Sequence, residues 1–246
     1  MSNTIHKNLQ PLPRLENAGM DAWLVRLFDA IDERNMVWMT ALVSACKQVF
    51  GDQLVDIVPS YTTVLVQFDA LQLDHAQARR LLQQVLAELE PAAETDHKPL
   101  IELPVWYHLN VGPELARLSQ HTGLEIPTLI ELHCQPVYRV FALGFAPGFA
   151  FMGTLPALLE LPRLTQPRAK VSTGSVAIAG RQTAAYPSAS PGGWNVLGRT
   201  PTQLFDLHRP TLSLLQVGDR VRFVPITQAQ FERLGGDSTP MARETY

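Results

Sequence analysis

The chain has 246 residues, of which 46% are hydrophobic and 17% charged, which is enough apolar material for one large or two modest globular domains. Its formal net charge of −3 argues against the positive surface by which proteins neutralise a nucleic-acid backbone, so no nucleic-acid partner is expected. Cys46 and Cys134 are too few for a secreted disulfide framework, and no apolar run has the length of a signal peptide or a membrane span, so we expect a cytoplasmic protein.

Strand-like and helix-like hydrophobic periods alternate in the first part of the chain. Residues 22–28 (AWLVRLF) are typical of a strand. Residues 32–50 carry apolar side chains at a spacing of about 3.6, which predicts a helix, and Gly51 stands where its C-cap is expected. Two β-rich runs at residues 54–58 and 64–68 then predict a pair of antiparallel strands.

A second helix is predicted to begin at Asp74, because Gln77 follows at the spacing of a capping box. The resulting order, β-α-β-β-α, is one strand short of a ferredoxin-like α/β sandwich. Residues 90–99 (EPAAETDHKP) have little to bury and predict a linker. We therefore expect an N-terminal α/β sandwich domain in residues 1–97 and a second domain in residues 98–246.

The second domain opens with a predicted strand at residues 101–107, then a short helix from 112 to 123 and another at 127–133. Such a helix pair invites comparison with a helix-turn-helix, but Arg117 is the only cation that the pair offers to phosphates. Beyond Tyr138 the sequence breaks into short β-prone runs separated by Gly and Pro, which is typical of a closed or nearly closed β-barrel. The predicted fold class is α+β.

Four segments of the second domain have unusual turn chemistry. They are residues 144–153 (GFAPGFAFMG), 167–175 (PRAKVSTGS), 179–187 (AGRQTAAYP) and 190–201 (SPGGWNVLGRTP). We refer to them as the four motif segments. Because they are ordered and specific, a chance match of all four to a known pattern is improbable.

In order and approximate spacing, the four motif segments resemble the signature of the PxpB/KipI family, which includes the B subunit of the bacterial ATP-dependent 5-oxoprolinase and is similar to allophanate hydrolase subunit 1. That signature runs G-F-x-P-G-F, P-R-x-x-V-x-x-G-S-V, A-G-x-Q-T-x-x-Y-P and S-P-G-G-W-x-x-x-G-R-T-P. The resemblance implies an α/β domain followed by a cyclophilin-like β-barrel. An acidic, Gly-rich loop common in the family is replaced here by residues 107–110 (YHLN), so no role is carried over to it.

The resemblance also implies a function in a heteromeric complex. With an A-type partner (LamB/YcsF-like) and a C-type partner (KipA-like), such a chain hydrolyses 5-oxo-L-proline to L-glutamate while ATP becomes ADP and phosphate. Other members imply two alternatives: a KipI-like inhibitor of a sensor histidine kinase, and a carboxyltransferase-like or allophanate-hydrolase-like subunit of a urea-utilisation complex. Fold alone does not choose among them.

Substrate contacts are expected from turn glycines and aromatic rings of the motif segments, because glycine lets a backbone approach a ligand and a flat ring can wall a pocket. For the glycines, simple turn chemistry is the alternative, and for the tryptophan and tyrosine it is a place in the core. The substrate-binding candidates are Pro147, Gly148, Phe149, Gly174, Tyr186, Gly192, Gly193 and Trp194.

Catalytic roles are expected from five polar side chains. Arg168 and Arg199 each lie beside a proline-bearing turn, and a guanidinium on a stiff loop suits bidentate capture of a carboxylate or phosphate. Ser175 and Gln182 offer hydrogen bonds to a substrate carbonyl or a water, although no G-x-S-x-G elbow supports Ser175 as a nucleophile. His133 is a candidate general acid or base, with a structural histidine as the alternative.

The sequence lacks three familiar binding patterns. It has no G-x-x-x-x-G-K-[ST] phosphate loop, no dinucleotide fingerprint, and no His/Cys/Asp cluster with metal-ligand spacing. We therefore expect no metal on this chain, ATP as a co-substrate bound on a partner or across an interface, and catalysis only in the assembled complex.

Overall fold

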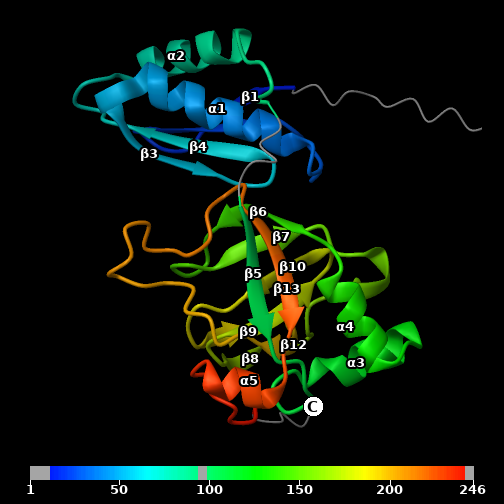
Figure 1. Cartoon of the computed structure of the whole chain (residues 1–246). Coiled ribbons are helices and arrows are strands. Elements are labelled where there is room, and N and C mark those ends of the chain that lie inside the picture. Colours follow the sequence, from blue (N-terminus) through cyan, green and yellow to red (C-terminus); the bar gives the residue numbers. More distant parts are fainter. Residues whose placement is uncertain (1–11, 94–98, 242–246) are drawn as a thin grey trace, which may run out of the picture. The chain divides into compact units, whose positions relative to one another are not determined.

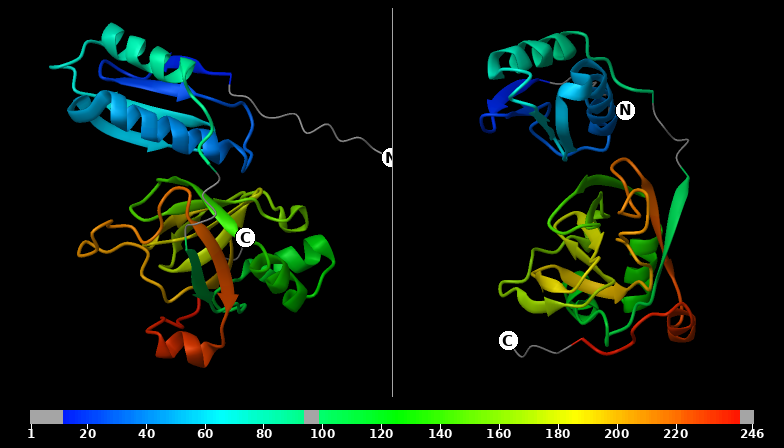
Figure 2. Two further views of the ribbon diagram at one scale, coloured as in Figure 1. Left: turned by 45° about the horizontal axis from the view of Figure 1, so that its top comes forward. Right: turned by 90° about the vertical axis from the view of Figure 1, so that its left-hand side faces the viewer.

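In the computed structural model, which describes residues 12–93 and 99–241, the chain divides into two units, Met1–His97 and Lys98–Tyr246, each with its own hydrophobic core (Figure 1). The first unit is a four-stranded antiparallel sheet in the order β1-β2-β4-β3. Two helices cover one face of this sheet (Figures 1 and 2). The elements are β1 (Arg14–Asn17), β2 (Ala22–Arg26), α1 (Asn35–Phe50), the 3-10 turn η1 (Gly51–Gln53), β3 (Leu54–Pro59), β4 (Thr63–Phe68) and α2 (His75–Ala87).

The predicted elements of this unit are confirmed, with shifts of a few residues at their ends. Gly51 ends α1 with φ of 50°, and its N–H bonds to the carbonyl of Lys47. The capping box of α2 is present, since the Gln77 N–H donates to Asp74 Oδ1 at 2.7 Å and the Asp74 N–H donates to Gln77 Oε1 at 2.8 Å. The additional strand that the sequence pattern required is β1, which precedes the first helix and pairs with β2.

The second unit is built on a seven-stranded sheet in the order β12-β9-β10-β7-β6-β13-β5, in which only β13 and β5 run parallel. A two-stranded ribbon of β8 and β11 accompanies it. Its strands are β5 (Leu100–Val105), β6 (Tyr138–Leu143), β7 (Ala150–Gly153), β8 (Arg168–Val171), β9 (Ser175–Ala179), β10 (Gln182–Ala185), β11 (Ser190–Gly192), β12 (Asn195–Arg199) and β13 (Arg220–Pro225).

The sheet nearly closes into a barrel, as the sequence predicts. Its two edge strands, β5 and β12, are joined where Trp106 and Arg199 exchange two backbone hydrogen bonds of 2.9 Å each. Two glycines make this approach possible: a Cβ on Gly112 would lie 2.0 Å from the Leu197 carbonyl oxygen, and one on Gly198 would lie 2.7 Å from the Trp106 carbonyl oxygen.

Helices of the second unit lie outside the barrel (Figure 1). The helix predicted up to Gly123 is α3 (Glu114–Thr122), with Gly123 left-handed at φ of 72°, and the next is α4 (Ile126–Cys134). A 3-10 turn, η2 (Ala157–Leu159), and a capped C-terminal helix, α5 (Gln228–Arg233), complete the unit. Throughout the part of the chain that the structure describes, no helix combines the length and apolarity needed to cross a membrane.

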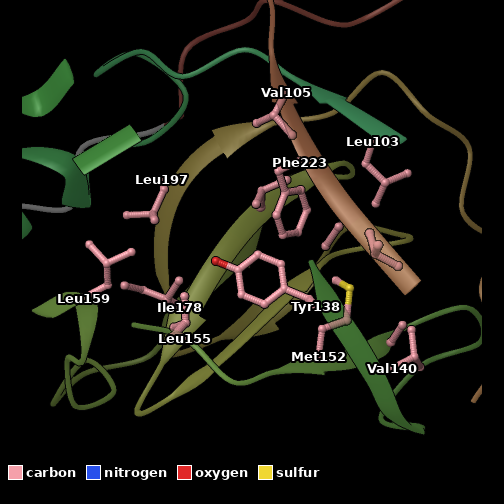
Figure 3. Packing of buried hydrophobic residues seen from close by; sticks show 14 of the residues in the cluster. Leu103, Val105, Tyr138, Val140, Met152, Leu155, Leu159, Ile178, Leu197 and Phe223 are labelled. Atoms are coloured by element: carbon pink, nitrogen blue, oxygen red, sulfur yellow. The ribbon is translucent and has the colours of Figure 1, made fainter. Parts of the chain in front are cut away.

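The barrel interior is filled by large apolar side chains, with the Tyr138 ring among Phe223, Met152 and Ile178 (Figure 3). Strand β9 is buried on both faces, because Val176 and Ile178 belong to this core while the alternate Ala177 and Ala179 belong to a second apolar cluster. That second cluster includes Phe149, Tyr186 and Trp194 from three of the motif segments. The motif segments therefore meet over the outer face of β9.

Candidate functional site: a pocket at a buried arginine

Three aromatic substrate-binding candidates come together outside the barrel. The Phe149 ring lies edge-on to Tyr186 at 5.2 Å between centroids and to Trp194 at 5.8 Å. Trp194 is 5% exposed and Tyr186 is 1% exposed, and burial raises the pKa of Tyr186 to about 12. In this chain these rings form a core, which is the alternative considered from the sequence, rather than an open pocket wall.

Two of the candidate glycines next to these rings, Gly148 and Gly192, have packing reasons for being glycine. Gly148 has φ of 81°, and a Cβ there would lie 2.8 Å from the Cβ of Phe205. A Cβ on Gly192 would lie 2.3 Å from the Tyr186 hydroxyl oxygen, whereas one on Gly193 would make ordinary contacts of 3.6 Å and longer. Pro147 is exposed beside Gly148. Gly192 therefore lets two motif segments pack closely at Tyr186, whereas nothing in the structure requires glycine at 193.

A pocket of about 350 Å³ lies next to this aromatic core. Its walls come from three of the four motif segments and from the segment that follows α5. The charged lining residues are Lys170, Arg199 and Asp237, and the hydroxyl-bearing ones are Ser172, Thr173, Thr200 and Thr202. We call it the Arg199 pocket.

Arg199 is 2% exposed and ends β12. Its Nη1 donates hydrogen bonds to the backbone carbonyls of Asp237 and, at 2.9 Å, Thr239. Burial lowers the pKa of Arg199, although Asp237 opposes this effect. An arginine nevertheless keeps its proton in proteins, so this pocket wall carries a buried positive charge.

Gly174 connects the aromatic core to the Arg199 pocket. Its N–H donates to the Tyr186 carbonyl at 2.7 Å, and its carbonyl accepts from the Thr200 N–H at 2.8 Å. Next to it, the fully buried Ser175 lies directly opposite Arg199 in the pairing of β9 with β12. Gln182 is half-buried at the start of β10 and is not a lining residue of the pocket.

Arg168, predicted to share the anion-binding role of Arg199, has a different environment. It is 3% exposed and forms an ion pair with Glu114, whose other carboxylate oxygen accepts the Val196 N–H at 2.8 Å. Burial raises the pKa of Glu114, while Arg168 and the Val196 N–H act in the opposite direction. The pair joins α3 to β8, and the bond from Val196 joins α3 to β12, so Arg168 is placed to hold the fold together.

His133, the predicted general acid or base, is fully buried and stacks on Phe223 at 4.7 Å between ring centroids. Because a backbone carbonyl can only accept, the Thr183 hydroxyl donates to the Ala177 carbonyl at 3.2 Å and accepts from His133 Nε2–H at 3.0 Å. His133 Nδ1 then accepts from the Tyr107 hydroxyl at 2.7 Å. Both ring nitrogens are satisfied by a neutral imidazole, which fits the structural alternative.

Burial lowers the pKa of His133 to about 3, and this shift predicts a pH-dependent stability. In the unfolded chain a histidine titrates near 6.5, so between that pH and about 3 the unfolded state binds one more proton than the folded state. The free energy of unfolding should therefore fall as the pH drops, with His133 accounting for about 2 kcal/mol between pH 7 and pH 5. Urea denaturation at both pH values measures it.

The matched variants for this experiment are His133→Gln, which should lose this part of the pH dependence, and His121→Gln at an exposed histidine, which should keep it. An imidazole resonance of His133 that titrates near pH 6.5 in the folded protein would contradict the prediction even if His133→Gln does not fold.

Some residues of this region were not predicted. Lys170 and Thr200 line the pocket and stand inside the motif segments. Their polar side chains in those segments were the signal by which the sequence could have identified them. Glu114 follows Pro113 at the start of α3, and its pairing with Arg168 joins positions 54 residues apart. The segment after α5 carries no motif that the sequence could have offered as a signal.

No group of three or more His, Cys, Asp or Glu side chains is placed to hold a metal ion within residues 12–93 and 99–241.

Comparison with known proteins gives one family match and several similar chains. The family model of the carboxyltransferase domain, subdomain C and D, matches residues 13–215. The chain is 30% identical over 232 residues to the 5-oxoprolinase B subunit of Bacillus subtilis (strain 168), covering 89% of this chain and 95% of that protein. It is 41% identical over 175 residues to the 5-oxoprolinase B subunit of Escherichia coli O157:H7, covering 70% of this chain and 78% of that protein.

Among solved structures, the crystal structure of TTHA0988 in space group P212121 superposes with a TM-score of 0.73 at 35% sequence identity. The match covers 85% of this chain and 40% of the TTHA0988 chain. The chain thus spans less than half the length of this structural relative.

Proposed function

The chain belongs to the family of 5-oxoprolinase B subunits, and from this premise we propose that it is the B subunit of an ATP-dependent 5-oxoprolinase. The observation that carries the proposal is the Arg199 pocket, where three motif segments and the segment after α5 surround one buried guanidinium. Residues from three of the four segments that carry the family signature line this pocket, which supports a site common to the family.

The proposed reaction hydrolyses 5-oxo-L-proline to L-glutamate while ATP is converted to ADP and phosphate. A five-membered lactam resists hydrolysis, and phosphorylation of its amide oxygen turns it into an electrophile that water can open. In this reaction the role of the chain is to bind and orient an anionic group at Arg199. Arg168 and His133 are not proposed to touch the substrate. Arg168 is engaged in the ion pair with Glu114, and His133 is buried in the barrel core with both ring nitrogens hydrogen-bonded.

Two further proteins are proposed as partners, an A-type chain (LamB/YcsF-like) and a C-type chain (KipA-like) of the same enzyme. The designation of the relatives as B subunits supports an assembly with other chains. The sequence also has no phosphate loop for ATP, which supports a nucleotide site on a partner or across an interface. We propose that the complex works in the cytoplasm, consistent with the free cysteines Cys46 and Cys134.

At a finer level we propose that residues 1–97 and 98–246 are separate domains. The first would be a ferredoxin-like sandwich in which β1 takes the edge position of a strand that ordinarily follows the second helix, a circularly permuted order. The second would be a cyclophilin-like barrel, for which the nearly closed sheet is the support.

Reconstitution tests the proposed function. Phosphate and glutamate release are measured with 5-oxoproline and ATP for the purified chain, for each pair of proteins, and for all three proteins together. We expect turnover only from the three together, because the sequence has no phosphate loop that would let this chain bind ATP by itself. Lactam hydrolysis by the single chain would overturn the shared site. If the three proteins together show no turnover, the function is instead that of a histidine-kinase inhibitor or of a subunit in a urea-utilisation complex.

A further inference from the structure

The guanidinium of Arg199 uses only one of its edges within the fold. Nη1 is occupied by the carbonyls of Asp237 and Thr239, while Nε and Nη2 are buried and have no hydrogen-bond partner among the described residues. Nε–H and Nη2–H point in the same direction, and this edge of an arginine matches the two oxygens of a carboxylate or phosphate group. Leaving such donors buried and unpaired is costly, which favours an incoming acceptor.

A second polar group lies on the same side of the sheet. Residues directly opposite in an antiparallel pair share a face, so the side chains of Ser175 and Arg199 lie on one face of β9 and β12. Ser175 Oγ is also buried without a hydrogen-bond partner in the described part of the chain. Ser175 is fully buried and does not line the Arg199 pocket, so we assign it no contact with the ligand.

The surroundings favour a single negative charge on the ligand. Lys170 and Arg199 contribute two positive charges to the pocket wall and Asp237 contributes one negative charge. Asp237 is exposed, and its carboxylate accepts the Thr239 N–H at 2.9 Å, so water and this bond screen it. The volume of about 350 Å³ lies at the lower end of the usual range for ligand pockets, which suits a small molecule.

From these observations we infer that the Arg199 pocket is an oxyanion site, in which the Nε–Nη2 edge of Arg199 receives two oxygens of the ligand. The inference deepens the proposed function and rests on it for one point, the identity of the ligand as the carboxylate of 5-oxoproline. A phosphoryl group presents the same oxygens and is the other source of this chemistry. The backbone of the segment after α5 fixes the guanidinium before the ligand arrives, which reduces the ordering that binding requires.

The test measures binding to the full chain without ATP or partners, by amide chemical shifts in the motif segments during titration. The probes are 5-oxoproline, pyrrolidin-2-one, which has the same lactam ring without the carboxylate, and inorganic phosphate. We expect 5-oxoproline to shift the amides of Gly174 and Thr200 and pyrrolidin-2-one to leave them unchanged. Binding of phosphate alone would support the site with a phosphoryl group as its ligand. Binding of neither anion, or equal binding of the two lactams, would overturn the inference.

Variants locate the binding. Arg199→Lys keeps the charge but loses the parallel donors, so affinity for the anion should fall about 10- to 100-fold. Lys170→Ala at the exposed rim should weaken binding only a few-fold and in a salt-dependent manner, and Lys47→Ala on α1 should leave it unchanged. Thermal unfolding of each variant checks its fold, and the ligand series on the unaltered chain stands if Arg199→Lys does not fold.

The two proposals fail in different ways. Anion binding that depends on Arg199, together with an inactive mixture of the three proteins, would keep the oxyanion site and remove the 5-oxoprolinase function. Full turnover of the three proteins when this chain carries Arg199→Lys would keep the 5-oxoprolinase function and remove the oxyanion site.

Discussion

Replacing Arg168 by alanine is expected to lower the free energy of unfolding of the second unit by about 3–5 kcal/mol. The cost arises because Glu114, which is 6% exposed, would remain buried without its cationic partner. Its pKa, already raised by burial, would rise further once Arg168 no longer opposes that effect. Urea denaturation followed by the fluorescence of Trp106 and Trp194, both in this unit, measures the change.

Two comparisons separate the ion pair from a general loss of an arginine. Arg233→Ala removes an exposed arginine from the last turn of α5 and should change stability by less than about 0.5 kcal/mol. The double variant Arg168→Met with Glu114→Gln removes both charges and should recover part of the loss, because no uncompensated charge is left buried. An Arg168→Ala protein as stable as the Arg233→Ala protein would show that the buried pair contributes nothing.

The different surroundings of Arg168 and Arg199 show where inference from the sequence stops. Both arginines stand beside proline-bearing turns in motif segments, and the sequence pattern predicts one role for both. Their difference depends on distant positions, since the partner of Arg168 is Glu114 and the partners of Arg199 are carbonyls after α5. Neither contact is local, and neither leaves a periodic or spaced pattern in the sequence.

Features with a local cause were predictable. The capping box of α2, the glycine that ends α1 and the short strands of the barrel all follow from neighbouring residues. Strand β1 was missed because RLEN lacks the alternation of a half-buried strand and has only four residues. The position of His133 inside the barrel was equally hidden, because a histidine near the end of a helix looks the same whether it faces the core or the solvent.

The substitution of Gly174 by alanine is expected to have an effect of similar size, about 3 kcal/mol or more, together with loss of anion binding at the Arg199 pocket. Gly174 has φ of 78°, which strains any other residue by about 1–3 kcal/mol. A Cβ there would also lie 2.3 Å from the Thr200 carbonyl oxygen, a backbone atom, and 3.3 Å from Cγ of Arg199. The added methyl group must therefore displace the strand end that carries the arginine.

Two other glycines separate these causes. Gly180 has φ of 54° with no neighbour within 4 Å of a Cβ, so Gly180→Ala should show the backbone strain alone, about 1 kcal/mol, with anion binding retained. Gly144 has neither a left-handed φ nor a close neighbour, and Gly144→Ala should change stability by less than about 0.5 kcal/mol. Urea denaturation and the 5-oxoproline titration are measured on all three variants. If Gly174→Ala resembles Gly180→Ala in both measurements, close packing against Thr200 does not position Arg199, because strain is then the whole effect.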